Sequence, residues 1–123
     1  MIHGVVNSGP EIWVRLPILD GNGVEQMIDA VLDTGFNGAV TLPTALIASL
    51  RLPWLTRGQV RFGNGSVEWI EYYKGTIVWD GVHRRVRVQA IDGSPLIGMS
   101  LLAGYDLRAR VVLGGDVQIE AIP

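Results

Sequence analysis

The sequence predicts an all-β fold with one or two short helices. Its 123 residues include 16 glycines, which separate short runs rich in Val, Ile, Trp and Tyr, and this spacing is typical of strands joined by tight turns. Asp-Gly and Asn-Gly pairs, such as Asp20-Gly21 and Asn64-Gly65, are strong hairpin signals. Helical signals are confined to two short segments, so we expect strands to form the core.

Bulk composition limits the classes of function. A chain of this length buries about two-thirds of its unfolded surface, so we expect a single domain over residues 1–123. The absence of cysteine excludes disulfides and thiolate zinc sites and favours the cytoplasm. No signal stretch and no run of roughly 18 apolar residues is present, so we expect a soluble protein without a membrane partner. The net charge of -2 disfavours nucleic-acid binding.

Three strands are predicted before residue 33. Ile2–Val6 is expected to be an edge strand. A half-buried strand is predicted over residues 11–16, where Ile12, Val14 and Leu16 alternate with Glu11, Trp13 and Arg15. The Asp-Gly-Asn-Gly sequence of residues 20–23 predicts a reverse turn. The mostly apolar residues 27–32 then form a strand that ends at Asp33.

A short strand and a brief helix are expected next. Residues 39–42 are predicted to be the strand, and Pro43 begins the helix because proline suits a first helical turn. Pro53 closes this segment. The apolar face of the helix is formed by Leu46, Ile47 and Leu50.

A long hairpin is predicted from residues 59–62 and 67–73. Its tip is Gly63-Asn64-Gly65-Ser66, a glycine-rich turn. A flexible tip of this kind can close over a ligand. An ordinary surface hairpin is the alternative interpretation.

Residues 79–82 predict another turn, followed by a strand whose inward side chains are Val86, Val88 and Ala90. The basic side chains nearby indicate a solvent-exposed strand face and not a recognition surface. They are His83, Arg84, Arg85 and Arg87.

The C-terminal part is predicted to contain a strand end, a helical turn and a hairpin. Residues 96–98 pass through glycine into one or two helical turns that Gly104 ends. Residues 107–113 and 117–122 are expected to pair around the Gly114-Gly115-Asp116 turn.

The tripeptide Asp33-Thr34-Gly35 is the strongest candidate for a functional site. A carboxylate at the end of a buried strand is costly to desolvate unless hydrogen bonds or a function hold it there. Thr34 supplies a hydroxyl, and Gly35 permits a tight turn and close approach of a ligand. This combination points to acid–base chemistry.

Other candidate groups fit structural roles. Five of the remaining aspartates sit beside glycine in turns or, for Asp29, within a strand. The turn aspartates are Asp20, Asp80, Asp92 and Asp116. His3 and His83 are far apart without metal-ligand spacing, and no Gly-x-Ser-x-Gly motif occurs, so we expect neither a metal site nor a serine hydrolase. The tryptophans are expected in the core or an interface, with Trp54 or Trp69 as possible groove residues.

Three features in this order resemble the retropepsin-like (clan AA) aspartic proteases, and in particular their small prokaryotic single-domain branch. They are Asp33-Thr34-Gly35 after an apolar strand, the glycine-tipped hairpin, and Leu96-Ile97-Gly98 before a short helix. The similarity extends from Val14 to Leu102. It implies a closed retropepsin-like β-barrel with a hairpin flap, a peptide or protein substrate, no cofactor, and a homodimer in which each chain supplies one aspartate.

The same resemblance assigns roles to individual residues. Asp33 is implied to be the catalytic acid, Thr34 to hydrogen-bond across the dimer axis, and Gly35 to contact the substrate backbone. The strand of residues 96–98 is implied to run beneath this loop. The implied substrate-binding residues are Phe36, Asn37, Val40 and Leu96 beside the loop, and Gly63, Asn64, Gly65 and Ser66 in the flap.

The sequence departs from the retroviral pattern at three positions. Phe36 replaces a small residue, Asn37 replaces an acid, and Met99 replaces an arginine. The acid and the arginine form an ion pair in retroviral members. Because both charges are absent here, no buried charge is left unpaired, and we expect an altered dimer interface with an intact site. The strands Ile2–Val6 and 117–122 are the expected dimer contacts.

The predicted activity is that of an aspartic endopeptidase. Two carboxylates that share one proton can activate a water molecule and polarise the scissile carbonyl. A retropepsin fold that binds a peptide or partner protein without cutting it is the main alternative, because fold alone does not determine activity. A structural β-barrel in which Asp33 is only hydrogen-bonded is a third.

Overall fold

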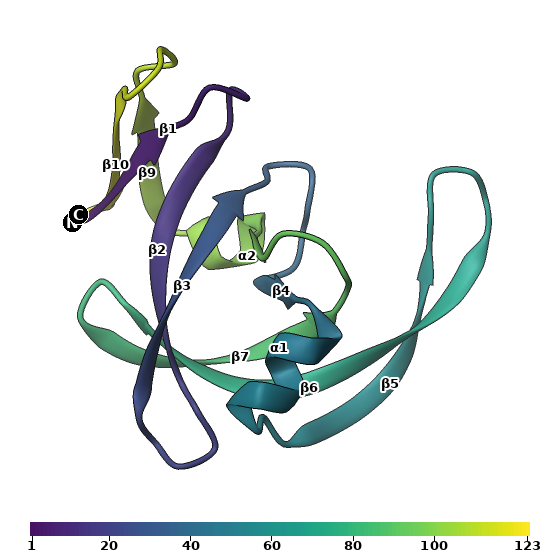
Figure 1. Ribbon diagram of the computed structural model, residues 1–123. Helices are drawn as coiled ribbons and strands as arrows, with labels where there is room; N and C mark the ends of the chain where they lie inside the picture. The colour runs from purple at the N-terminus through teal and green to yellow at the C-terminus, as the bar shows by residue number, and fades with distance from the viewer.

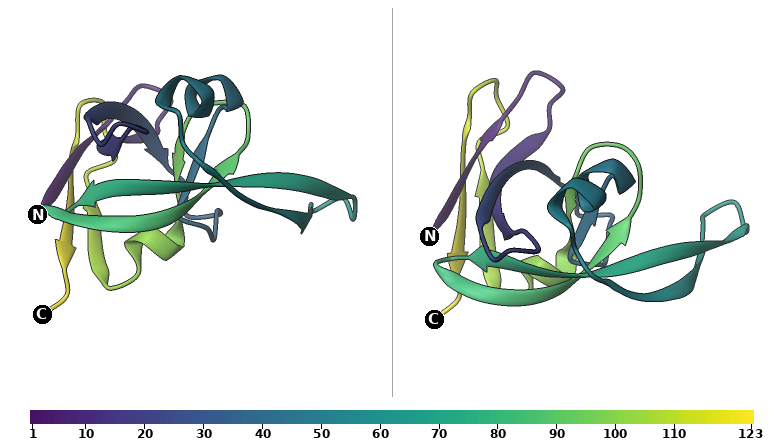
Figure 2. Two further views of the ribbon diagram at one scale, coloured as in Figure 1. Left: turned by 90° about the horizontal axis from the view of Figure 1, so that it is seen from below. Right: turned by 60° about the horizontal axis from the view of Figure 1, so that its bottom comes forward.

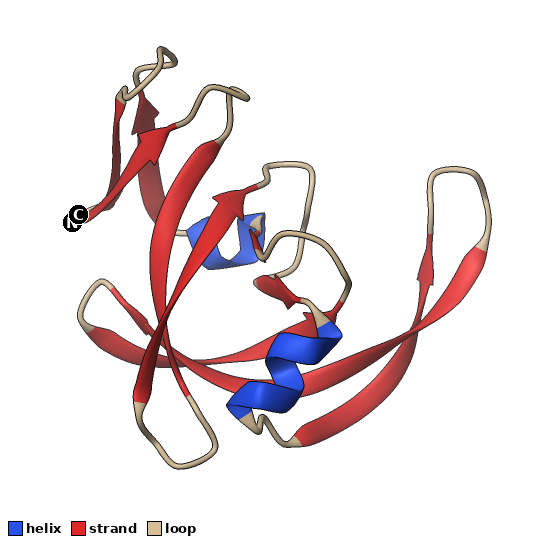
Figure 3. Cartoon of the chain, viewed as in Figure 1, coloured by secondary structure: helices blue, strands red, loops and turns tan.

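The computed structural model describes all residues from Met1 to Pro123 and contains ten strands and two helices (Figures 1 and 3). Neither helix has the length and apolar character needed to cross a membrane. The strands are β1 (Ile2–Val6), β2 (Ile12–Leu19), β3 (Glu25–Leu32), β4 (Val40–Leu42), β5 (Trp54–Arg61), β6 (Val67–Trp79), β7 (Val82–Ala90), β8 (Leu96–Ile97), β9 (Tyr105–Ala109) and β10 (Asp116–Ala121). The helices are α1 (Thr44–Leu50) and α2 (Met99–Leu102).

All ten strands belong to one sheet in the order β5-β6-β7-β4-β8-β3-β2-β1-β10-β9. An additional pairing between β2 and β6, with Ile18 opposite Ile77, closes the central part into a ring. The predicted all-β fold with a closed sheet is therefore confirmed. Figure 2 shows that α1 and α2 lie on opposite sides of the long β6–β7 ribbon.

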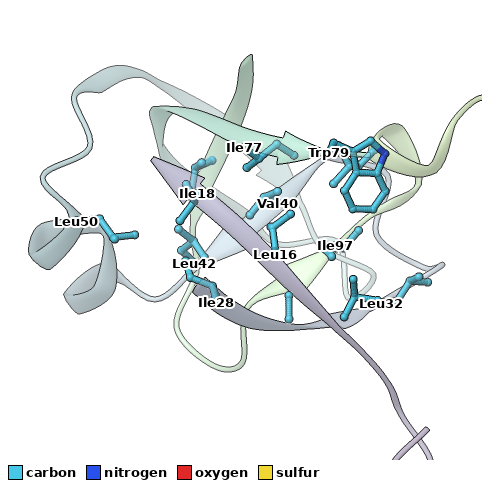
Figure 4. Close-up of a cluster of buried hydrophobic side chains, with 14 of the residues drawn as sticks. Leu16, Ile18, Ile28, Leu32, Val40, Leu42, Leu50, Ile77, Trp79 and Ile97 are labelled. Carbon is cyan, nitrogen blue, oxygen red and sulfur yellow. The ribbon is translucent and has the colours of Figure 1, made fainter. Parts of the chain in front are cut away.

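The core fills the ring with aliphatic side chains from most elements (Figure 4). In β2 the alternation predicted from the sequence places Val14, Leu16 and Ile18 inward, each with 1% or less of its surface exposed. Trp79 is also buried, and its ring meets that of Tyr105 edge to face, 5.9 Å between centroids. Burial of alternate residues fixes the register of β2, because a shift by one residue would expose this set to solvent.

Both predicted helices are present. Pro43 caps α1, whose buried residues are Ile47 and Leu50, and the Thr44 N–H donates to Asp92 Oδ1 at 3.1 Å. After α2, Gly104 adopts a positive φ of 88°, as expected for a residue that ends a helix.

The position predicted for Ile2–Val6 is wrong. These residues form a strand, but β1 lies between β2 and β10, and β10 lies between β1 and β9. The free edges of the sheet belong to β5 and β9. The reason is that Val117 and Ile119 of β10 are fully buried, which holds the C-terminal hairpin against β1.

The C-terminal hairpin also differs from its predicted boundaries. Its first strand spans Tyr105–Ala109 and not residues 107–113. The chain leaves the sheet after Ala109, because local bonds turn it back: the Val112 N–H donates to the Arg110 carbonyl and the Gly115 N–H to the Val112 carbonyl, each at 2.8 Å.

Candidate active site

Asp33 stands where β3 leaves the sheet. Its backbone N–H donates to the Ile97 carbonyl at 2.9 Å, and its own carbonyl accepts from the Phe36 N–H at 3.1 Å. Its carboxylate Oδ1 accepts from the Gly35 N–H at 2.9 Å. The side chain is half-buried. The loop therefore holds one carboxylate oxygen by a backbone donor and leaves the group partly open to solvent.

Strand β8 lies between β3 and β4, the two strands that the Asp33 loop connects. It pairs in parallel with β3, where Leu32 lies opposite Ile97, and antiparallel with β4, where Val40 lies opposite Ile97. Beyond the strand, the Met99 N–H donates to the Phe36 carbonyl at 2.8 Å. The predicted passage of residues 96–98 beneath the acidic loop is confirmed.

Phe36 folds back onto two glycines. A methyl group at Gly38 would lie 2.5 Å from Phe36 Cζ, and one at Gly98 would collide with the Phe36 ring and with the Gly38 carbonyl. Glycine at both positions thus makes room for the half-buried ring. Phe36 does not line the hollow that contains Asp33, so it leaves that side of the carboxylate accessible.

A hollow of about 390 Å³ lies beside Asp33. Its walls come from β3, from the start of β2, and from β8. Thr34 and Leu96, both predicted site residues, belong to this lining, and Thr34 is exposed. The other lining residues are Pro10, Glu11, Ile12, Val31 and Leu32.

Sequence reasoning missed the loop before β2 as part of this hollow. Asn7 shapes that loop, because its Oδ1 accepts from the N–H groups of Gly9 and Glu11 at 2.9 and 2.7 Å. The Asn-Ser-Gly-Pro composition signals a turn. Only the pairing of β2 with β3, in which Trp13 lies opposite Val31, places the loop beside Asp33.

The structure does not support the site role predicted for Val40. This side chain has no exposed surface and belongs to the core cluster, so it cannot contact a substrate in this structure. Its place in β4, between β7 and β8, turns it toward the interior. The prediction of Val40 as a pocket-lining residue is wrong.

The predicted flap tip, residues 63–66, lies at the end of the β5–β6 hairpin, which projects from the barrel (Figure 1). The tip is a local turn in which Ser66 donates through its N–H and hydroxyl to Asn64 Oδ1 at 2.9 and 2.7 Å. It does not line the hollow at Asp33. The structure therefore places the tip and Asp33 apart within one chain.

Asn37 lies on the other side of the loop from this hollow. It lines a second hollow of about 420 Å³ together with residues of β7, including Arg85 and Arg87. Arg84, expected on the solvent-exposed face, is half-buried, and its guanidinium donates to the Ser100 and Leu101 carbonyls of α2 at 3.2 and 3.3 Å. Arg84 therefore ties β7 to α2, which corrects its predicted role.

The tryptophans divide into two groups. Trp79 is in the core and Trp13 is half-buried in β2, whereas Trp54 and Trp69 are 58% and 57% exposed on the hairpin. Trp54 Nε1 donates to Glu71 at 2.7 Å, and the Arg57 guanidinium lies 4.5 Å from the centre of the Trp69 ring. These two residues do not line the hollow at Asp33.

The five aspartates predicted to be structural have partners within the chain. Asp80 binds the N-terminal ammonium at 2.8 Å, and exposed Asp29 pairs with Arg15 at 3.4 Å. In the β2–β3 turn, the backbone N–H of Val24 donates to Asp20 and lowers the pKa of its carboxyl group, with smaller contributions from Asn22 and Gln26.

Comparison with known proteins identifies the architecture. No protein-family model and no curated protein sequence matches this chain. Its structure is similar to the crystal structure of a retropepsin-like aspartic protease from Rickettsia conorii, with a TM-score of 0.56, 15% sequence identity, and coverage of 99% of this chain and 91% of that one. The chain therefore has the retropepsin-like fold that its sequence predicts.

Proposed function

We propose that this protein is an aspartic endopeptidase in which Asp33 is the catalytic acid. The observation that carries the proposal is the half-buried Asp33 carboxylate, which accepts from the Gly35 N–H and borders an open hollow, within a retropepsin-like fold. The fold alone is compatible with other functions. The acid, the hydroxyl and the glycine at the end of β3 favour peptide hydrolysis.

The proposed reaction uses two copies of Asp33, one from each chain of a homodimer. Two carboxylates close together share one proton, because both cannot be ionised at short range. The ionised carboxylate takes a proton from water, which attacks the scissile carbonyl, and the neutral carboxyl group donates a hydrogen bond to the carbonyl oxygen. The proton taken from water then passes to the leaving amine. These steps require no cofactor.

Thr34 and the substrate-binding residues complete the proposed site. Thr34 is exposed, which suits a hydrogen bond from its hydroxyl to the partner chain. Gly35 would contact the substrate backbone, Leu96 would border the scissile residue, and residues 63–66 would close over the peptide. We also propose that residues 1–123 act as one domain and that the protein works in the cytoplasm.

We propose a different location for the dimer contact, because β1 and β10 are already paired on both sides and cannot gain a strand from a second chain. The loops at residues 33–39, 7–11 and 110–115 lie at the same end of the sheet (Figure 1). Val111, Val112 and Leu113 are 65%, 62% and 78% exposed. With strands about 4.8 Å apart, this apolar loop lies roughly 14 Å from Asp33 across the sheet. We place the dimer contact there.

Digestion of an unbiased peptide library, read by mass spectrometry, tests the proposal. The wild-type protein should cut peptides at defined positions, and Asp33→Asn should cut none. Peptides that are retained but never cut would instead favour a retropepsin-fold binding protein. A monomeric protein with neither property would favour a structural role for Asp33.

A further inference from the structure

The second hollow beside the acidic loop carries an unexplained positive charge. Its volume is about 420 Å³, and it lies between residues 37–39 and the first half of β7. Its lining includes Arg84, Arg85 and Arg87 and contains no aspartate or glutamate. This is notable in a chain whose net charge is -2, since acidic side chains are available elsewhere on the surface.

The exposed arginines of this hollow have no structural partner. Arg84 is bound to carbonyls of α2, but Arg85 and Arg87 form no ion pair and no side-chain hydrogen bond within the chain. Arg87 also lies directly opposite Lys74 of β6. Like charges directly opposite each other in an antiparallel pair are destabilising. The fold therefore gives no reason for this cluster, and an anion would relieve the repulsion.

The arginine-lined hollow lies next to the loop that carries the proposed catalytic Asp33. Asp33 and Asn37 belong to the same loop between β3 and β4, and the two hollows lie at its two ends. Gln89 of β7 packs against Gly38 of this loop, because a methyl group on Gly38 would lie 2.9 Å from Gln89 Nε2. An extended peptide advances about 3.3 Å per residue, so a peptide that passes Asp33 along the loop reaches the arginines within a few residues.

We propose that this hollow is a subsite in which Arg85 and Arg87 bind a carboxylate of the substrate. The inference rests on the proposed function and adds to it a substrate class, namely peptides with an acidic group at a fixed distance from the scissile bond. Arginine suits this role because its planar guanidinium binds a carboxylate through two parallel hydrogen bonds.

A larger hollow of about 680 Å³ beside the β2–β3 turn shares Arg85 and Arg87 and adds Lys74. It also contains Asp20, which would repel an anionic ligand, and none of its lining residues belongs to the acidic loop. The smaller hollow is therefore the better site for a substrate carboxylate. Lys74, which lines only the larger one, distinguishes the two experimentally.

The test uses a random peptide library in two measurements. The wild-type protein digests the library, and immobilised Asp33→Asn protein retains peptides from it; both pools are sequenced by mass spectrometry. Amidated peptides with an internal Glu and free-acid peptides without one separate a side-chain carboxylate from a terminal one. We expect acidic residues or free C-termini to be enriched on the order of tenfold at one position, as charge-assisted pairs of this kind permit.

Matched variants test whether the enrichment of acidic peptides depends on this hollow. Arg85→Gln with Arg87→Gln should remove the enrichment in both pools and leave the cleavage of neutral peptides unchanged. Arg51→Gln with Arg108→Gln removes the same charge from exposed positions outside the hollow. This double variant should preserve the enrichment of acidic peptides, and so should Lys74→Gln.

The outcomes separate the two proposals. Acidic enrichment in the retained pool that depends on Arg85 and Arg87, without any cleavage by the wild-type protein, would support the subsite and reject the peptidase. Cleavage without acidic enrichment, or enrichment that survives the arginine changes, would reject the subsite and leave the peptidase standing. Loss of enrichment in Lys74→Gln alone would place the carboxylate in the larger hollow and overturn the assignment.

Discussion

At the scale of the residue, Asp33 combines partial burial with a single backbone donor to its carboxylate. A change at this side chain leaves the sheet intact, because the strand pairing beneath it uses only backbone atoms. This separation between fold and chemistry means that substitutions at Asp33 should report on function.

Asp33→Asn should therefore abolish cleavage and leave the fold intact. Asparagine keeps the shape and can still accept from the Gly35 N–H, but it cannot act as a general base, which costs on the order of 10²–10⁴-fold in rate. Peptide turnover and circular dichroism measure the two effects. Asp29→Asn, at an exposed strand position, is the control and should retain activity. Turnover by purified Asp33→Asn within about tenfold of the wild-type rate would refute the assignment.

Gly98 provides a residue-scale test of the loop packing. Gly98→Ala should destabilise the fold by about 1–3 kcal/mol, the usual range for overpacking, because its methyl group meets the Phe36 ring and the Gly38 carbonyl. Gly63→Ala is the control, since no atom lies within 4 Å of a methyl group there. Urea denaturation gives both values. Equal stability of Gly98→Ala and wild type would show that the loop is not packed as described.

At the scale of the element, the β2–β3 turn depends on a charged side chain. The Asp20 carboxylate accepts from the Val24 and Asn22 N–H groups at 3.0 and 2.8 Å and from the Gln26 amide at 3.1 Å. These donors favour the ionised form and lower its pKa, the Val24 N–H most strongly. The bonds thus stabilise the folded hairpin when Asp20 is ionised.

The pH dependence of this turn follows from the direction of the shift. A carboxyl group whose pKa is lower in the folded state stabilises it above the unfolded value of about 3.9, and this contribution is lost as the pH falls through the folded value. Asp20→Ala should therefore lower the denaturation midpoint at pH about 7, and the difference from wild type should shrink below pH about 3. A difference that stays constant with pH would show that the carboxylate charge is not responsible.

At the scale of the whole molecule, the proposed activity depends on assembly, because each chain contains one Asp-Thr-Gly sequence. The terminal strands cannot supply the contact from within the sheet, and deleting residues 117–123 would uncover the buried core instead of separating two chains. The apolar loop at residues 110–115 is the surface that substitution can test.

Val112→Asp should shift the protein toward monomer and reduce its specific activity, since a charge at a packed apolar contact is unfavourable. Val82→Asp is a matched control, because Val82 is 65% exposed and Val112 62%, and Val82 is the first residue of β7, outside the proposed contact. Analytical ultracentrifugation and activity on dilution measure the effect. An unchanged sedimentation profile for Val112→Asp would place the interface elsewhere.

The rate of cleavage should have a bell-shaped dependence on pH. Only the singly protonated pair of carboxyl groups is competent, so activity is lost when both groups are protonated and again when both are ionised. We expect a maximum between about pH 4 and about pH 6.5, because a carboxyl group beside a carboxylate keeps its proton above the ordinary aspartate pKa of about 4. Steady-state rates across the range measure it. A rate that rises continuously through about pH 8 would exclude the two-carboxylate mechanism.

Local signals in the sequence were sufficient to predict most helices and strands and the candidate active-site loop at Asp33. The Asp20–Gly23 turn, the Pro43 helix start and the Gly104 helix end each depend on the conformational preferences of a few neighbouring residues. The alternation in β2 and the apolar run before Asp33 report burial directly. These features made the all-β class and the acidic loop predictable before any tertiary contact was known.

The sequence by itself determined most of the strand segments and where the carboxylate stands, because both follow from interactions within a few residues. Only the tertiary structure decided which strands are neighbours. It placed β1 inside the sheet, buried Val40, brought residues 10–12 beside Asp33 and directed Arg84 to α2. These outcomes depend on pairing between segments far apart in the chain, which burial of the whole core selects and no local pattern encodes.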